Sequence, residues 1–188
     1  RHSYAVGTVA RLVSRRCRVL KKTIERMQFS GIMFAAGLLH DIGKVLMTEF
    51  FPEECLKIVE EASASDTTAV DAEIKVLGVS HGDAGLYAGV EWKFPVILVN
   101  VIGRHHWPLP TILSRLKTKQ GRLAQRVIRI ADAASYELGY DMLRSDGKPP
   151  TLEPELFEKT GLEKKEFDKW TNDIKNDISY TIDVLGKV

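Results

Sequence analysis

Apolar residues recur at three- and four-residue spacing along nearly the whole chain, and this periodicity limits the possible fold more than any other feature. Val6, Val9, Ala10 and Val13 lie at positions i, i+3, i+4 and i+7 of one stripe, which is the pattern of an amphipathic helix. Related stripes lie in residues 29–39, 123–138 and 162–185. We find no convincing alternation of apolar and polar residues, the pattern typical of a half-buried strand. The sequence therefore predicts an all-α protein.

Local signals mark several helix boundaries. Pro52 is followed by two glutamates, a pattern typical of the first turn of a helix. Gly78 is expected to close a helix that contains residues 73–77. The apolar residues after Pro95 are expected to form a helix that leads to His105 and His106 and is stopped by Pro108 and Pro110. The neighbours His40 and Asp41 are expected to lie on one helix. Ser80 and Asp83 have the spacing of a capping box, which would place His81 in the first turn of the next helix.

The histidines and two aspartates are the candidate metal ligands. They are His2, His40, Asp41, His81, His105, His106 and Asp132. Imidazole together with carboxylate suits borderline first-row ions such as iron, manganese, nickel or zinc. Helical bundles build metal sites from inward-facing side chains of different helices. Gly37 and Gly43, which flank the His40–Asp41 pair, would let a neighbouring helix or an ion approach closely.

Composition excludes several classes of function. The net charge is +2, which is too small to indicate nucleic-acid binding by itself. No run reaches the roughly 18 apolar residues of a membrane span. Cys17 and Cys55 lie far apart and lack a CxxC context, so we expect packing residues in a reduced, cytoplasmic protein.

Residues 1–26 hold eight basic residues and one acidic residue. This stretch favours a solvated helix face first and a surface for a partner or anionic ligand second.

The segment Gly37-Leu38-Leu39-His40-Asp41-Ile42-Gly43-Lys44 resembles the central motif of the HD-domain phosphohydrolase superfamily. The later series Glu73, Gly78, His81, Gly85, Trp92, Pro95, His105-His106 and Pro108 resembles the HDOD branch, a relative of the HD-GYP cyclic-di-GMP phosphodiesterases. The resemblance runs from His2 to about Ser135. It implies an HD-domain-like helical bundle with a metal site in its core.

The resemblance also implies a ligand set for two divalent ions. In this set, a first ion is held by His2, His40, Asp41 and Asp132. Asp41 also bridges to a second ion. That second ion is held by His81 together with His105, His106 or both. A hydroxide shared by the metals attacks a phosphate ester. Lys44, one turn after His40, would contact a phosphate oxygen or the leaving group, which makes Asp41 and Lys44 the candidate catalytic residues. His106 has an alternative role in holding a ligand or the phosphate in place.

Two functions remain open at this point. The first is a metal-dependent phosphohydrolase or phosphodiesterase of bacterial signal transduction, acting on a phosphate ester or nucleotide. The alternative is a non-catalytic HDOD module that binds metal or nucleotide and relays a signal to partner proteins. Trp107-Pro108-Leu109-Pro110 follows the histidine pair where HD-GYP proteins carry Gly-Tyr-Pro, which argues against cyclic-di-GMP as the substrate. A nucleotide or diadenosine-polyphosphate hydrolase of a sister branch is a weaker reading.

The expected domain organisation follows from the part of the chain that the resemblance covers. We expect a metal-binding helical core over residues 1–145, followed by a C-terminal loop and long helix over residues 146–188 that pack on it. Lys148-Pro149-Pro150 would form the loop. The chain begins with Arg1, and a candidate ligand already stands at position 2, so we expect that upstream residues are missing. Membrane and nucleic-acid partners are not expected.

Overall fold

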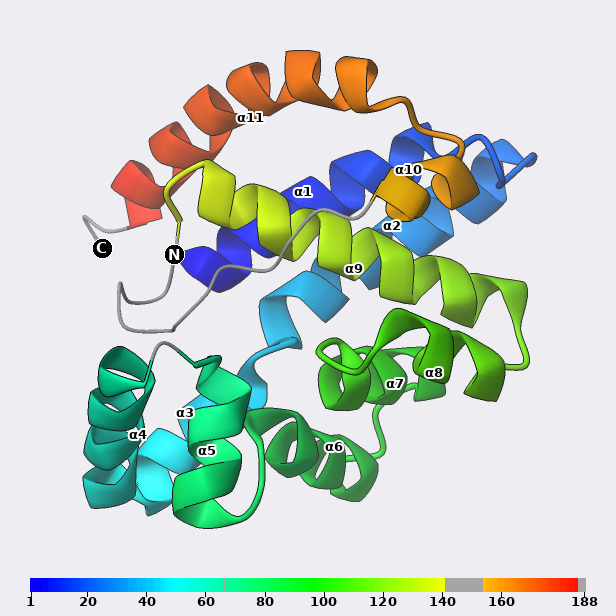
Figure 1. Ribbon diagram of the computed structural model, residues 1–188. Helices are drawn as coiled ribbons and strands as arrows, with labels where there is room; N and C mark the ends of the chain where they lie inside the picture. The colour runs from blue at the N-terminus through cyan, green and yellow to red at the C-terminus, as the bar shows by residue number, and fades with distance from the viewer. Residues whose placement is uncertain (66, 141–153, 186–188) are drawn as a thin grey trace. The chain divides into compact units, whose positions relative to one another are not determined.

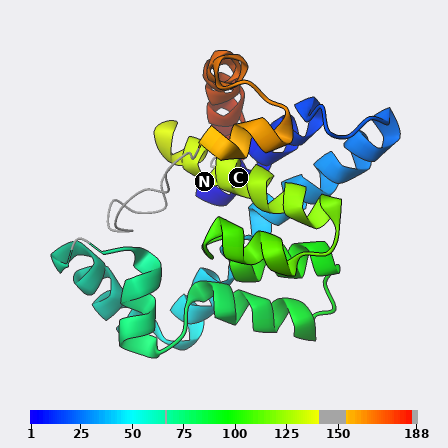
Figure 2. The ribbon, with the colours of Figure 1, turned by 45° about the vertical axis from the view of Figure 1, so that its right-hand side comes forward.

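The computed structural model describes residues 1–65, 67–140 and 154–185, and within these ranges it contains eleven helices and no β-strand (Figures 1 and 2). The prediction of an all-α protein is confirmed. The chain divides into two compact units. We call residues 1–38, 126–140 and 154–185 the terminal unit, and residues 39–125 the central unit. The predicted domain boundary at 145 and the predicted loop at 148–150 lie outside the described residues, so both stay predictions.

The terminal unit begins with α1 (His2–Arg16) and most of α2 (Thr23–Leu39). The predicted stripe of α1 is buried, and Val6 and Val9 have no exposed surface. The two helices cross closely at glycines. A Cβ built on Gly37 would lie 2.5 Å from the Cα of Gly7, so no larger residue fits without moving a helix. The predicted close approach at Gly37 is confirmed.

The terminal unit is completed by the second part of α9 (Lys119–Glu137), by α10 (Pro154–Thr160) and by α11 (Lys164–Leu185). Helix α11 contacts α1 through the face that the sequence predicts, with Phe167, Ile174 and Ile178 buried. At the edge of this contact, the guanidinium of Arg16 lies 4.2 Å from the ring centroid of Trp170.

The central unit holds α3 (Ile42–Phe50), α4 (Pro52–Ala64), α5 (Ala69–Leu77), α6 (His81–Glu91), α7 (Val96–Arg104), α8 (Leu109–Arg115) and the first part of α9. Helix α6 packs against both α3 and α7, and α4 packs against α5 (Figure 1). A small cluster of Met47, Ile58, Ala62 and Ala72 joins α3, α4 and α5. These packings bring the start of α3, the start of α6 and the end of α7 together.

The predicted boundaries around α5 and α6 are confirmed. Gly78 ends α5 in the left-handed conformation with φ 76°, which glycine adopts without steric cost. Ser80 and Asp83 form the predicted capping box, and His81 is the first residue of α6. Pro52 is likewise the first residue of α4.

Two local expectations were wrong. The pair His40–Asp41 does not lie within one helix, because α2 ends at Leu39 and Asp41 is the N-cap residue of α3. Pro108 and Pro110 do not end α7, which stops at Arg104. They begin α8 instead, since proline at the start of a helix lacks an N–H that would have no partner there anyway.

One apolar stretch, Thr23–Phe50, is long and apolar enough to cross a membrane by length and composition alone. A buried core helix passes the same test, and 44% of the most apolar window is buried. The stretch is not one continuous helix, because the His40–Asp41 break divides it into helices of 17 and 9 residues. The expectation of no membrane partner stays a prediction.

Candidate metal centre

The carboxylate of Asp41 is the centre of a buried cluster in the central unit. Its Oδ1 atom lies 3.3 Å from Nε2 of His81 and 3.5 Å from Nε2 of His105. Its Oδ2 atom lies 3.0 Å from Nζ of Lys44 and 3.4 Å from Nε2 of His40. The break between α2 and α3 allows this, because Asp41 sits outside both helices and its side chain can reach the ends of α6 and α7.

His81 is held by a carboxylate that the sequence did not assign to the site. Glu73 on α5 accepts a hydrogen bond from the backbone N–H of His81 at 2.8 Å. Its carboxylate oxygens also lie 2.7 and 2.8 Å from Nδ1 of His81. A carboxylate accepts hydrogen bonds, so Nδ1 carries the proton, and a neutral His81 has its lone pair on Nε2. A carboxylate behind a histidine is the usual support of a metal ligand.

His105 is oriented in the same sense by the backbone of α7. Its Nδ1 atom lies 2.9 Å from the carbonyl oxygen of Ile102 and 3.2 Å from that of Val101. Because carbonyl oxygens accept only, Nδ1 again carries the proton and Nε2 carries the lone pair. His106 is exposed beside it, with a ring centroid 4.0 Å from that of His105 and 4.9 Å from that of His81.

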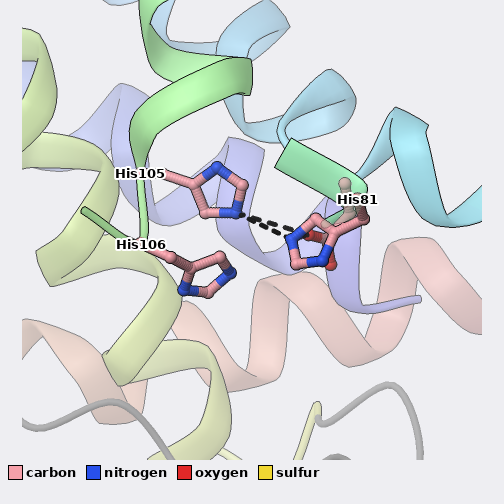
Figure 3. A group of neighbouring side chains, drawn as sticks. His81, His105 and His106 are labelled. Atoms are coloured by element: carbon pink, nitrogen blue, oxygen red, sulfur yellow. Dashed lines mark hydrogen bonds and ion pairs between the residues drawn. The ribbon is translucent and has the colours of Figure 1, made fainter. Parts of the chain in front are cut away.

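The lone pairs of the cluster converge on one place. Figure 3 shows the rings of His81 and His105 facing each other with His106 alongside. The two Nε2 atoms are 3.4 Å apart, and each lies 3.3–3.5 Å from Oδ1 of Asp41. Ligand atoms about 2.1 Å from one ion, at tetrahedral or octahedral angles, are separated by about 3.0–3.4 Å. The cluster therefore fits a first-row metal ion in both chemistry and spacing.

The charges of the cluster are strongly coupled. Burial alone would raise the pKa of Asp41, but His40, Lys44 and hydrogen bonds with His105 and His81 outweigh burial and hold that pKa well below its usual range. Burial would lower the pKa of His81, yet hydrogen bonds with Asp41 and Glu73 raise it to about 9. Without a metal ion, His81 is therefore protonated at neutral pH, and its positive charge lies beside the Asp41 carboxylate.

Burial and the neighbouring histidines act in the opposite direction on His106. Protein atoms packed around the ring desolvate it, although part of the residue's surface is exposed. This desolvation is the largest effect, and the charges of His105 and His81 add to it, so the pKa of His106 is held well below its usual range. A neutral imidazole at neutral pH is the form that binds a metal ion or accepts a hydrogen bond. His106 is therefore available for either of its two predicted roles.

The backbone at Gly43 allows the ligands of α3 and α6 to meet. A Cβ built on Gly43 would overlap the carbonyl oxygen of His81, and it would lie 2.9 Å from the backbone nitrogen of Gly85. Any side chain at this position must push α3 away from α6. The predicted close approach at Gly43 is confirmed, and the neighbour is the helix that carries His81.

The remaining candidates, His2 and Asp132, form a buried pair in the terminal unit. Nε2 of His2 lies 3.1 Å from Oδ1 of Asp132. Nδ1 of His2 lies 2.7 Å from the carbonyl oxygen of Tyr140, so this nitrogen carries the proton and Nε2 faces the carboxylate. The His2 ring also meets the ring of Tyr136 edge-on, at 5.3 Å.

The structure thus brings Asp41, His81, His105 and His106 together as one group that could hold a metal ion. His40 and Lys44 lie beside Asp41, and His2 and Asp132 lie together in the terminal unit. Ligation by the full predicted set, and the phosphate contact of Lys44, stay predictions. The sequence missed the role of Glu73, although its place in the motif series and its short distance before the Gly78 turn were available as a signal.

Comparisons with known proteins agree with this fold. The HDOD domain model matches residues 1–108, a range that ends before Asp132. A crystal structure of an HDOD domain protein of unknown function from Geobacter sulfurreducens superposes with a TM-score of 0.66 at 21% identity. A crystal structure of a proposed signal transduction protein from Marinobacter aquaeolei VT8 superposes with a TM-score of 0.72 at 15% identity. At these identities the likeness shows the fold alone.

The chain corresponds to only part of each relative. The two structures cover 94% and 96% of this chain, but the chain covers 60% and 37% of theirs. An uncharacterized protein of Treponema pallidum (strain Nichols) is 27% identical over 73 residues, which are 39% of this chain and 14% of that protein. The predicted helical fold with a buried His/Asp cluster is confirmed.

Proposed function

We propose that this chain, which belongs to the HDOD family, binds a divalent first-row metal ion through Asp41, His81 and His105 and hydrolyses a phosphate ester in bacterial signal transduction. The convergence of one carboxylate oxygen and two imidazole lone pairs within 3.5 Å of one another carries this proposal. Nitrogen and oxygen ligands favour iron, manganese, nickel or zinc. The second ion, with the ligands that the resemblance implies for it, belongs to the same proposal and is tested by counting metal.

The bound ion would lower the pKa of water and offset charge on a phosphoryl oxygen. The side chains of this chain supply the rest. Glu73 keeps the proton of His81 on Nδ1, so that Nε2 would be free to bind the ion. Lys44, with 15% of its side chain exposed beside Asp41, offers a cation to a phosphate oxygen. His106 is exposed and would orient the phosphate or complete the ligand set.

A second candidate function is a non-catalytic regulatory module that binds metal or nucleotide without turnover. The Trp107-Pro108 sequence after the histidine pair favours it, because it replaces the Gly-Tyr-Pro stretch of HD-GYP proteins. The relative from Marinobacter, described as a proposed signal transduction protein, is compatible with either function. A filled metal site is compatible with both functions.

The test measures metal and activity on the same preparation. We expect protein purified without chelators or a nickel column to contain one or two equivalents of a first-row ion by elemental mass spectrometry. With that ion present, it should hydrolyse a chromogenic phosphodiester. Asp41→Ala should lose both properties, whereas Asp168→Ala, which removes an exposed carboxylate paired with Lys164, should keep them.

The outcomes separate the two functions. Bound metal without turnover of any phosphodiester or nucleotide in a screen would exclude the hydrolase and leave the regulatory module. A protein that stays empty after incubation with each candidate ion would exclude the metal-dependent hydrolase and leave a regulatory module that binds nucleotide.

A further inference from the structure

An apolar groove of about 340 Å³ lies in the central unit, beside the C-terminal halves of α3 and α6. Aromatic side chains form most of its rim. Phe50, Phe51, Tyr87 and Trp92 are 70%, 50%, 72% and 52% exposed. Large apolar side chains gathered on one exposed surface usually mark a place where another molecule binds, and aromatic rings supply most of the contact area in such places.

The charges around the groove are mainly negative. Glu91 belongs to its lining. Glu49 precedes Phe50, and Glu53 follows Phe51 by two residues; both are exposed. Lys93, after the end of α6, is the nearest opposing charge in sequence. An occupant with apolar side chains and flanking basic residues would satisfy this surface.

The chain carries such a segment at the start of α2. Ile24 and Met27 are 70% and 63% exposed, and they share one helix face with Gly31, at positions i, i+3 and i+7. A Cβ built on Gly31 meets nothing within 4 Å, so this face is open. Lys21 and Lys22 precede this face, Arg26 lies between Ile24 and Met27, and Glu25 is the single acidic residue beside them.

We propose that the first half of α2 of one copy of the chain docks into the α3–α6 groove of a second copy. Ile24 and Met27 would enter between the exposed rings, as anchors of an amphipathic helix enter an apolar groove. Lys21 and Lys22 would meet Glu53 and Glu91. The contact joins two different surfaces and is therefore heterologous, so it closes into a ring or continues as a chain of copies. The proposal does not rest on the metal chemistry proposed above.

The test follows self-association by sedimentation equilibrium over a range of protein and salt concentrations. We expect the chain to associate reversibly, and less strongly at high salt because the ion pairs are exposed. Met27→Asp and Tyr87→Asp should each weaken association about tenfold or more. Val96→Asp is the matched control, because Val96 is 76% exposed and lies outside the groove lining.

A charge exchange identifies the contact. Lys21→Glu with Lys22→Glu places acids against acids, and Glu53→Lys with Glu91→Lys places bases against bases, so each pair of changes should weaken association about tenfold. The chain with all four changes has both charges reversed and should associate like the unchanged protein. Circular dichroism and metal content check that each variant is folded.

Three results would overturn the proposal. One is a chain that sediments as a monomer at every concentration. Another is association that Met27→Asp and Tyr87→Asp leave unchanged. The third is failure of the four-residue exchange to restore association in a folded protein, which would show that the groove receives a different partner.

Discussion

At the scale of single residues, one carboxylate fixes both the position and the protonation of His81, a candidate metal ligand. Glu73 is 4% exposed and bonds the backbone N–H and the ring of His81 at once. Burying a carboxylate is costly unless it is well hydrogen-bonded. A purely structural helix pair would not need a buried carboxylate here, whereas the carboxylate has a clear role if His81 must present Nε2 to a cation.

Replacing Glu73 by glutamine should weaken metal binding by about 10- to 100-fold. The amide is uncharged and no longer makes the His81 imidazole a stronger base. Competition with a chromophoric chelator measures the change. Glu60→Gln is the control, because Glu60 is exposed on α4 and should leave the affinity unchanged; an equal loss in both variants would contradict the role of Glu73.

The pH dependence of the metal-free protein follows from His81. Its pKa is raised from the ordinary 6.5 to about 9, so its protonated form stabilises the fold fully below pH 6.5, and this stabilisation is lost as the pH rises through about 9. We expect the free energy of unfolding, measured with denaturant and a chelator, to fall by about 3 kcal/mol at most over that range. His81→Asn should remove this dependence; an unchanged slope in the variant would assign it to another group.

The residues of the site differ in how well the sequence predicts them. The sequence allowed the His40–Asp41 pair and the capping box before His81 to be predicted, because each depends on neighbours in the chain. It did not allow the role of Glu73 to be predicted, because an exposed acid and a buried acid look alike in a sequence. Only the packing of α5 against α4 and the turn at Gly78 place the Glu73 carboxylate behind His81.

At the scale of helices, the contact between α3 and α6 determines whether the ligands meet. Gly43→Ala should destabilise the protein by roughly 1–3 kcal/mol, because the added methyl group overlaps the backbone at His81. It should also weaken metal binding, since Asp41 is the N-cap residue of α3 and His81 begins α6. Denaturant unfolding and metal titration measure the two effects.

Gly31→Ala is the matched control for this change. Gly31 lies inside α2, where a Cβ meets nothing within 4 Å. Alanine in a helix interior is more stable than glycine by roughly 0.5–1 kcal/mol, so this variant should gain stability and keep its metal affinity. Equal destabilisation of both variants would contradict the specific contact at Gly43.

The helices also show where periodicity stops being informative. A stripe of apolar residues predicted α1 and α11 well, because each buries one face. Helix α8 was missed because Pro108 and Pro110 were interpreted as the end of a helix, although proline is equally compatible with a beginning. The break at His40–Asp41 was missed because the apolar pattern continues on both sides of it.

At the scale of the whole molecule, metal should act as a stabilising ligand. An ion at 100 times its dissociation constant contributes about 2.7 kcal/mol, which corresponds to a rise in Tm of about 5–10 °C for a chain of this size. Differential scanning calorimetry with and without a chelator measures the shift. Asp41→Ala should show no shift; a shift that survives in this variant would place the stabilising ion elsewhere.

The candidate metal ligands Asp41 and His81 stand at the beginnings of α3 and α6, and the apolar groove lies beside the far halves of the same two helices. If docking and metal binding favour different arrangements of this pair, each must change the affinity of the other by the same factor. Metal supply would then set how readily copies associate. Conversely, the concentration of the protein would set how much metal each copy retains. The α3–α6 pair would then respond both to the concentration of metal and to the concentration of the protein.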